Sequence, residues 1–104
     1  MPREYDKLVR DEIPAVVEAD GETPEAHAVN GEEYEERLFE KLSEETAELR
    51  EEPSAEELAD VLEVLDALRV QLGIDEAELE RVREEKADER GRFEEGIVLE
   101  RVED

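Results

Sequence analysis

The apolar residues between Ser54 and Gly73 recur with the spacing of an α-helix. At 100° per residue they cover nearly half of the helix circumference, which is wider than the apolar stripe of an ordinary surface helix. The residues of this face are Leu58, Val61, Leu62, Val64, Leu65, Leu68 and Leu72. A face of this width predicts that the helix lies at the centre of the fold. It also predicts that a second copy of the chain covers part of it, so we expect a homodimer or homotetramer.

Capping and turn residues predict three further helical segments around this central one. Proline and glycine separate the segments, and Ser, Asp or Asn stands where each helix would begin. The expected helices are a short one through Ile13, Val16 and Val17 capped by Asp11, one over residues 32–50 capped by Asn30, the central one over residues 54–72 that begins at Ser54, and one from the Asp75–Glu78 capping box to Gly91.

The fold class expected from these segments is all-α. We expect an antiparallel bundle of about four helices in a single domain, residues 1–104, with short extended tails. Residues 96–102 are predicted to form an edge strand that pairs with residues 26–29. Charged residues make up 47% of the chain, as in many disordered polyanions. Leu, Ile, Val and Phe nevertheless make up a quarter of it, and their helical periodicity favours a folded chain.

The acidic excess of the chain excludes several classes of partner. It holds 36 Asp or Glu against 13 Lys or Arg, a formal net charge of -23. Such a chain repels nucleic-acid phosphates and anionic membrane surfaces. It has no cysteine, no apolar run near the roughly 18 residues of a membrane span and no signal-peptide core at its start. We therefore expect a cytoplasmic protein that binds neither nucleic acid nor membranes, and a halophilic, high-salt cytoplasm.

Four carboxylates depart from the solvated faces on which most of the others lie. Glu45 falls inside the apolar arc of the expected 32–50 helix and Glu48 lies at its edge, while Glu57 and Asp60 hold the equivalent places on the next helix. Residues at i and i+3 share a helix face, and a short turn would bring the two pairs together. Their repulsion predicts a hard divalent cation, Mg²⁺ in the first place. Alternatively, Glu57 serves only the capping box that begins at Ser54.

A small number of cations could complement this acidic site. Leu79, Val82, Lys86 and Arg90 share one stripe of the last helix, which places two cations on its inward face. Lys7 and Arg10 form a second basic pair near the start of the chain. Metal-binding carboxylates beside such cations could hold metal-bound phosphates. The alternative for Lys86 and Arg90 is that they only complement the dipole at the end of their helix.

Four sequence motifs follow one another along the chain. They are KLVRDEIP at residues 7–14, KLSEETAEL at residues 41–49, ELADVLEV at residues 57–64 and KADERGRF at residues 86–93. Within them, the EETAE of residues 44–48 followed by the ELAD of residues 57–60 is similar to the EExxE…ExxD signature of the all-α nucleoside triphosphate pyrophosphohydrolases. The four motifs together resemble a small MazG-like, phosphoribosyl-ATP pyrophosphohydrolase-like group of that superfamily. The resemblance extends over nearly the whole chain.

The resemblance implies a role for each candidate residue. Glu45, Glu48, Glu57 and Asp60 would bind Mg²⁺, with Mn²⁺ as a possible substitute, and Glu44 or Glu45 would act as the catalytic base. Lys86 and Arg90 would face the substrate phosphates, with Lys7 and Arg10 as weaker candidates. Glu63 belongs to the motif but points away from this face and ranks below the other ligands.

The implied reaction is hydrolysis of a nucleoside triphosphate between its α and β phosphates. The products would be a nucleoside monophosphate and pyrophosphate, in a house-cleaning role or, as a narrower reading, from phosphoribosyl-ATP. The alternative from a different class is a non-catalytic acidic helical protein, either a binding adaptor or a nucleic-acid mimic, which the net charge of -23 favours.

Overall fold

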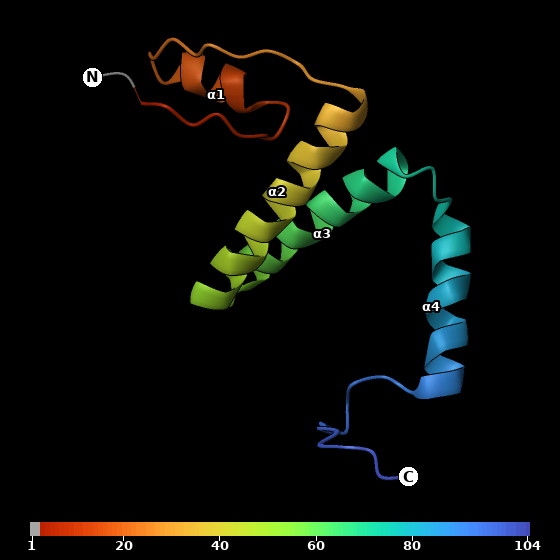
Figure 1. Ribbon diagram of the computed structural model, residues 1–104. Coiled ribbons are helices and arrows are strands. Elements are labelled where there is room, and N and C mark those ends of the chain that lie inside the picture. Colours follow the sequence, from red (N-terminus) through yellow and green to blue (C-terminus); the bar gives the residue numbers. More distant parts are fainter. Residues whose placement is uncertain (1–2) are drawn as a thin grey trace. The chain divides into compact units, whose positions relative to one another are not determined.

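A computed structural model describes residues 3–104 of the chain, and the described part contains four helices and no strand (Figure 1). The helices are α1 (Ile13–Ala19), α2 (Gly31–Glu51), α3 (Ala55–Gln71) and α4 (Glu76–Arg90). The all-α fold class is therefore confirmed. The chain divides into two compact units that meet at the Leu72–Gly73 junction, one with α1 to α3 and one with α4. The single domain over residues 1–104, the antiparallel four-helix bundle and the oligomeric state stay predictions.

The residues at the helix starts agree only in part with the caps predicted from the sequence. Ser54 caps α3 as expected, because its side-chain oxygen accepts a hydrogen bond from the Glu57 backbone N–H at 3.2 Å. Asn30 and Asp75 stand at the N-cap positions of α2 and α4, but neither side chain makes the capping bond. The cap predicted at Asp11 is wrong by one residue, since α1 is preceded by Glu12.

The predicted edge strand is also wrong. Residues 26–29 and 96–102 lie outside the helices, and no strand forms anywhere in residues 3–104. Ile97, Val98 and Leu99 are each more than three-quarters exposed. A strand needs a paired neighbour for its backbone groups, and neither segment has one in the described part of the chain.

Helices α2 and α3 form a helical hairpin that contains the apolar core of the first unit. Residues 52–54 connect the end of α2 to the start of α3, and Gln71 at the far end of α3 donates a hydrogen bond to the Gly31 carbonyl at 3.3 Å. Figure 1 shows the two helices packed along each other. The core is small. It consists of Leu38, Val64 and Leu68, with Leu8, Tyr34, Leu42 and Ala67 packed against it.

The wide apolar face of α3 is only partly covered by α2. Val61, Val64 and Leu68 are buried, whereas Leu58 and Leu62 remain 50% and 60% exposed. One neighbouring helix covers about half of such a face, and the other half stays in contact with solvent.

Candidate metal centre

The α2–α3 hairpin brings together five carboxylates, which we call the acidic cluster. They fall into two groups of three. Within each group the ligand oxygens lie within 4.8 Å of one another, so each group could hold a metal ion. One group is Glu44, Glu45 and Glu48, and the other is Glu45, Glu57 and Asp60. The four predicted metal ligands all belong to the cluster, but Glu48 lies in one group and Glu57 and Asp60 lie in the other. Glu45 is the residue that the two groups share.

Glu45 is the most buried carboxylate of the cluster. Only 6% of the residue is exposed, and one carboxylate oxygen, Oε1, lies 3.1 Å from the Lys41 ammonium. The other oxygen, Oε2, is buried and has no hydrogen-bond partner, and the same holds for Oε2 of Glu57. Buried polar atoms in folded proteins nearly always have a partner, and leaving one without costs stability. Two such oxygens beside other carboxylates fit the donor set of a hard cation.

Lys41 is a site residue that the sequence interpretation did not assign. Its side chain is 16% exposed and lies 3.5 Å from Glu44 Oε2 as well as 3.1 Å from Glu45 Oε1. Two sequence signals could have identified it. Lys41 stands four residues before Glu45, which places both on one helix face, and it is one of only three lysines in the chain.

The segment before α1 carries Lys7 and Arg10 to the acidic cluster. Lys7 donates a hydrogen bond to Glu44 Oε1 at 2.8 Å, and Arg10 donates one to Asp60 Oδ1 at 2.6 Å. Arg10 also lies 3.9 Å from Glu63, which is otherwise exposed and belongs to neither metal-binding group. These two weaker phosphate candidates are therefore paired with the carboxylates themselves.

Two contacts hold this segment on the hairpin. The Arg37 guanidinium on α2 donates hydrogen bonds to the Asp6 carbonyl at 2.9 Å and to Asp6 Oδ1 at 3.2 Å. Leu8 packs against the core. Asp6 has a φ of 42°, the left-handed conformation that Asp tolerates better than most residues. The segment therefore turns at Asp6 so that Lys7 reaches Glu44.

The electrostatics of the cluster differ from one carboxylate to the next. The hydrogen bond from Lys7 lowers the pKa of Glu44, with Lys41 contributing to the shift. Repulsion from Glu45, together with partial desolvation, raises the pKa of Glu48. Desolvation and then the charge of Asp60 raise the pKa of Glu57. In the described part of the chain, Glu48 and Glu57 are thus the carboxylates of the cluster that form no ion pair with Lys or Arg.

The charges near the cluster leave an imbalance that a divalent cation would remove. Within residues 3–104, the five carboxylates of the cluster lie beside three cations, namely Lys7, Arg10 and Lys41, so the carboxylates outnumber the cations by two. A hollow of about 610 Å³ adjoins the cluster at the hairpin turn and is lined by Glu48, Glu51, Glu52 and Glu57. Its volume is in the range of small-molecule sites, but its lining would repel a phosphate in the absence of a metal ion.

Lys86 and Arg90 lie on α4, in the second compact unit. Both are exposed there, and no residue of α4 is buried. Their contact with substrate phosphates stays a prediction, whereas Lys7 and Arg10 belong to the same unit as the acidic cluster.

Comparison with known proteins gives no match: no family model, no curated protein and no solved structure is significantly similar to this chain. The family resemblance therefore rests on the four sequence motifs. Among the helices of residues 3–104, none combines the length and the apolar character needed to cross a bilayer.

Proposed function

We propose that the chain is a divalent-metal-dependent pyrophosphohydrolase of nucleoside triphosphates. The observation that carries this proposal is Glu45, a carboxylate that is 6% exposed, has one buried oxygen without a partner and is shared by two groups of acidic residues. Burial of such a group is unfavourable unless a cation completes it. The order of the motifs in the sequence supports the same activity.

The metal ligands in this proposal are Glu45, Glu48, Glu57 and Asp60, with Mg²⁺ as the ion and Mn²⁺ as a substitute. When bound, the ion would neutralise phosphate charge and make water more acidic. Glu48 and Glu57 are available to bind it because no Lys or Arg within residues 3–104 forms an ion pair with either of them. Asp60 must exchange its 2.6 Å contact with Arg10 for the metal, which would free Arg10 for a phosphate.

The reaction is attack of water on the α-phosphorus. The bond between that phosphorus and the bridging oxygen to the β-phosphorus breaks, which releases a nucleoside monophosphate and pyrophosphate. Glu44 or Glu45 accepts the proton of the attacking water. Glu44 is a weak base while Lys7 keeps its pKa low, so this ion pair must open before Glu44 can act. Lys7, Arg10, Lys86 and Arg90 are the proposed phosphate contacts.

Release of pyrophosphate from a panel of nucleoside triphosphates and phosphoribosyl-ATP, with Mg²⁺ or Mn²⁺ at several KCl concentrations, tests the proposal. Turnover that requires the metal supports it, and no turnover under any condition refutes it. Glu48→Ala and Asp60→Ala are each expected to abolish activity while the helical content stays unchanged. Glu63→Ala is the matched control, because Glu63 lies in the same motif but in neither metal-binding group.

The half-exposed face of α3 supports the further proposal of a homodimer or homotetramer. Leu58, Leu62 and Leu65 are all between 44% and 60% exposed, and a second copy of this helix would cover them. Sedimentation in high salt tests this, and a monomer at micromolar concentration contradicts it.

A non-catalytic acidic protein is the second candidate, and the net charge of -23 favours it. It predicts tight binding to a basic partner and no stabilisation by Mg²⁺. A thermal-unfolding titration with Mg²⁺ in high KCl separates the two functions, because only the metal centre gives a saturable rise of the midpoint.

A further inference from the structure

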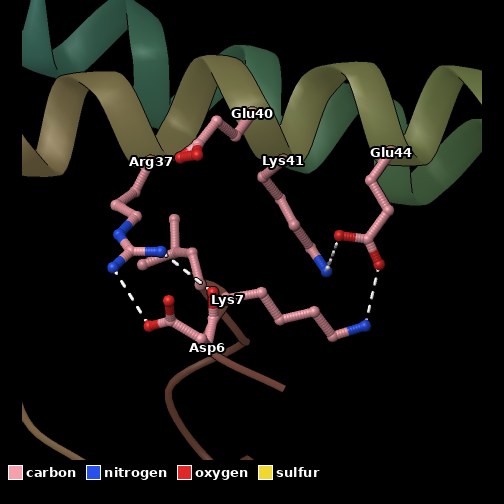
Figure 2. A pocket seen from close by; sticks show the side chains of 7 residues that line it. Asp6, Lys7, Arg37, Glu40, Lys41 and Glu44 are labelled. Atoms are coloured by element: carbon pink, nitrogen blue, oxygen red, sulfur yellow. Dashed lines mark hydrogen bonds and ion pairs between the residues drawn. The ribbon is translucent and has the colours of Figure 1, made fainter. Parts of the chain in front are cut away.

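The Glu44 carboxylate lies between two ammonium groups. Lys7 donates to its Oε1 at 2.8 Å, and Lys41 lies 3.5 Å from its Oε2 (Figure 2). Beside these side chains is a hollow of about 40 Å³, room for one or two water molecules. It is lined by Asp6, Lys7, Leu8, Arg37, Glu40, Lys41 and Glu44. Three cations and three carboxylates therefore line this small space, and two of the cations, Lys7 and Lys41, are directed at Glu44.

We propose that this hollow is a phosphate subsite, that the Glu44 carboxylate takes the place of the phosphate in the metal-free chain, and that metal binding opens it. The inference rests on the proposed function, since it requires the metal centre. A carboxylate and a phosphate present the same kind of charged oxygen acceptors to lysine. The two lysines that now hold Glu44 would then hold a phosphoryl group of the nucleotide.

The Glu44 carboxylate can move from the two lysines to the metal site because it lies beside both. It pairs with Lys7 and Lys41 on one side and forms a possible metal-binding group with Glu45 and Glu48 on the other. A divalent ion held by Glu45 and Glu48 would attract the neighbouring Glu44 carboxylate through a bound water and so compete with the two ammonium groups. Binding of the metal therefore weakens both lysine contacts.

The lysines stay in place when Glu44 leaves, because other contacts position them. The hydrogen bonds from Arg37 to Asp6 hold the chain next to Lys7, as Figure 2 shows. Lys41 is fixed on α2 and keeps its 3.1 Å contact with Glu45. Once Glu44 has turned away, Lys7 has lost its carboxylate partner and Lys41 keeps only its contact with Glu45. The site would thus acquire its affinity for phosphate only after the metal has bound.

The test is calorimetric binding of inorganic pyrophosphate, and separately of AMP, to the full chain in EDTA. Glu44→Gln removes the competing charge, so it should bind at least one of the two anions at least about tenfold more tightly than the wild type does. If only the affinity for pyrophosphate rises in Glu44→Gln, the hollow holds the leaving group. If only the affinity for AMP rises, the hollow holds the α-phosphate. Either result supports the subsite.

The matched control is Glu40→Gln, which removes one negative charge from the lining of the same hollow without freeing the lysines. It should leave the affinity of both anions unchanged, and adding Lys7→Met to Glu44→Gln should abolish the gain. An equal gain in Glu40→Gln, or no gain in either Glu44→Gln or Glu44→Ala, overturns the subsite. Circular dichroism verifies that each variant is folded.

A Mg²⁺ titration of the wild type separates this inference from the proposed function. If Mg²⁺ stabilises the wild type but Glu44→Gln binds neither anion more tightly, the subsite is refuted and the metal centre is still supported. A gain in Glu44→Gln without stabilisation by Mg²⁺ refutes the metal centre, and with it the opening of the hollow by metal.

Discussion

At the residue scale, Glu45 has surroundings unlike those of most acidic residues in the chain. Most carboxylates lie on exposed helix faces, where water compensates their charge. Glu45 is instead buried between α2 and α3, with Lys41 on one oxygen and no partner on the other. A single cation satisfies only half of the hydrogen-bonding capacity of a carboxylate. Glu45 also belongs to both groups of the acidic cluster, which together hold four other carboxylates.

Replacing Glu45 by Gln should separate metal binding from folding. The amide keeps the size of the side chain and can accept from Lys41, while its NH₂ can donate to a neighbouring carboxylate. We expect the metal-free protein to be at least as stable as the wild type and its affinity for Mg²⁺ to fall at least about tenfold. Thermal unfolding with increasing Mg²⁺ measures both quantities. Unchanged Mg²⁺ affinity would contradict the central position assigned to Glu45.

Glu48 and Glu57 predict an unusual pH dependence of stability. Their pKa values are raised above the ordinary value of 4.5, so the folded chain binds these protons more tightly than the unfolded chain does. Their contribution therefore favours folding at low pH and is lost as the pH rises from 4.5 through the raised values. In EDTA, Glu48→Gln and Glu57→Gln should each lose less stability than the wild type does as the pH rises. Unfolding midpoints measured against pH test the prediction.

Glu44 is the internal comparison for this experiment. Its pKa is lowered by Lys7, so its contribution to stability is present above 4.5 and is lost as the pH falls through the lowered value. Glu44→Gln should therefore destabilise the metal-free chain at neutral pH, whereas Glu48→Gln and Glu57→Gln stabilise it. If all three variants change the stability at neutral pH in the same direction, Glu44 does not differ from Glu48 and Glu57 in being paired with a cation.

At the scale of the helices, the start of α3 combines a capping function with a site function. Ser54 accepts the Glu57 backbone N–H, and Glu57 then carries its side chain into the acidic cluster. The capping box and the metal site, which are alternatives at the sequence level, are therefore compatible. The backbone of Glu57 serves the cap, and its carboxylate is left for the cluster.

Loss of the cap should weaken the fold and leave the metal ligands intact. Ser54→Ala removes the side-chain acceptor of this helix start, at a cost of about 1 kcal/mol in the free energy of unfolding. Ser54→Asn should retain the stability, because Asn is an equally good N-cap. Urea unfolding in EDTA measures the difference. An unchanged free energy of unfolding in Ser54→Ala would show that the packing of the hairpin alone determines where α3 begins.

At the scale of the whole molecule, the net charge of -23 predicts stabilisation by salt. Self-repulsion of an acidic chain disfavours its compact state, and the screening length falls from about 10 Å at 0.1 M to about 3 Å at 1 M salt. The unfolding midpoint should therefore rise steadily with KCl. Sucrose at matched osmolality is the control, because it does not screen charge. A midpoint that falls with KCl would contradict the expectation of a high-salt environment.

Helical periodicity predicted which carboxylates lie together in the acidic cluster because it is a local property. The phase of residues 32–50 placed Glu45 among leucines, and the phase of residues 54–72 placed Glu57 and Asp60 beside Val64 and Leu68. A turn of three residues then forces the two faces together. The edge strand at residues 96–102 was wrong for the converse reason, because a strand depends on a distant partner that its own residues do not specify.

The partners of the cluster depend on contacts between distant parts of the chain. Lys7 meets Glu44 across 37 residues and Arg10 meets Asp60 across 50 residues, because Leu8 packs on the core and Arg37 holds Asp6. Composition and spacing therefore sufficed for the all-α class, the acidic surface and the carboxylates of the site. Packing alone determined which carboxylates are paired with a cation and which retain a buried, unpartnered oxygen, because burial and long-range ion pairs exist only once the helices have come together.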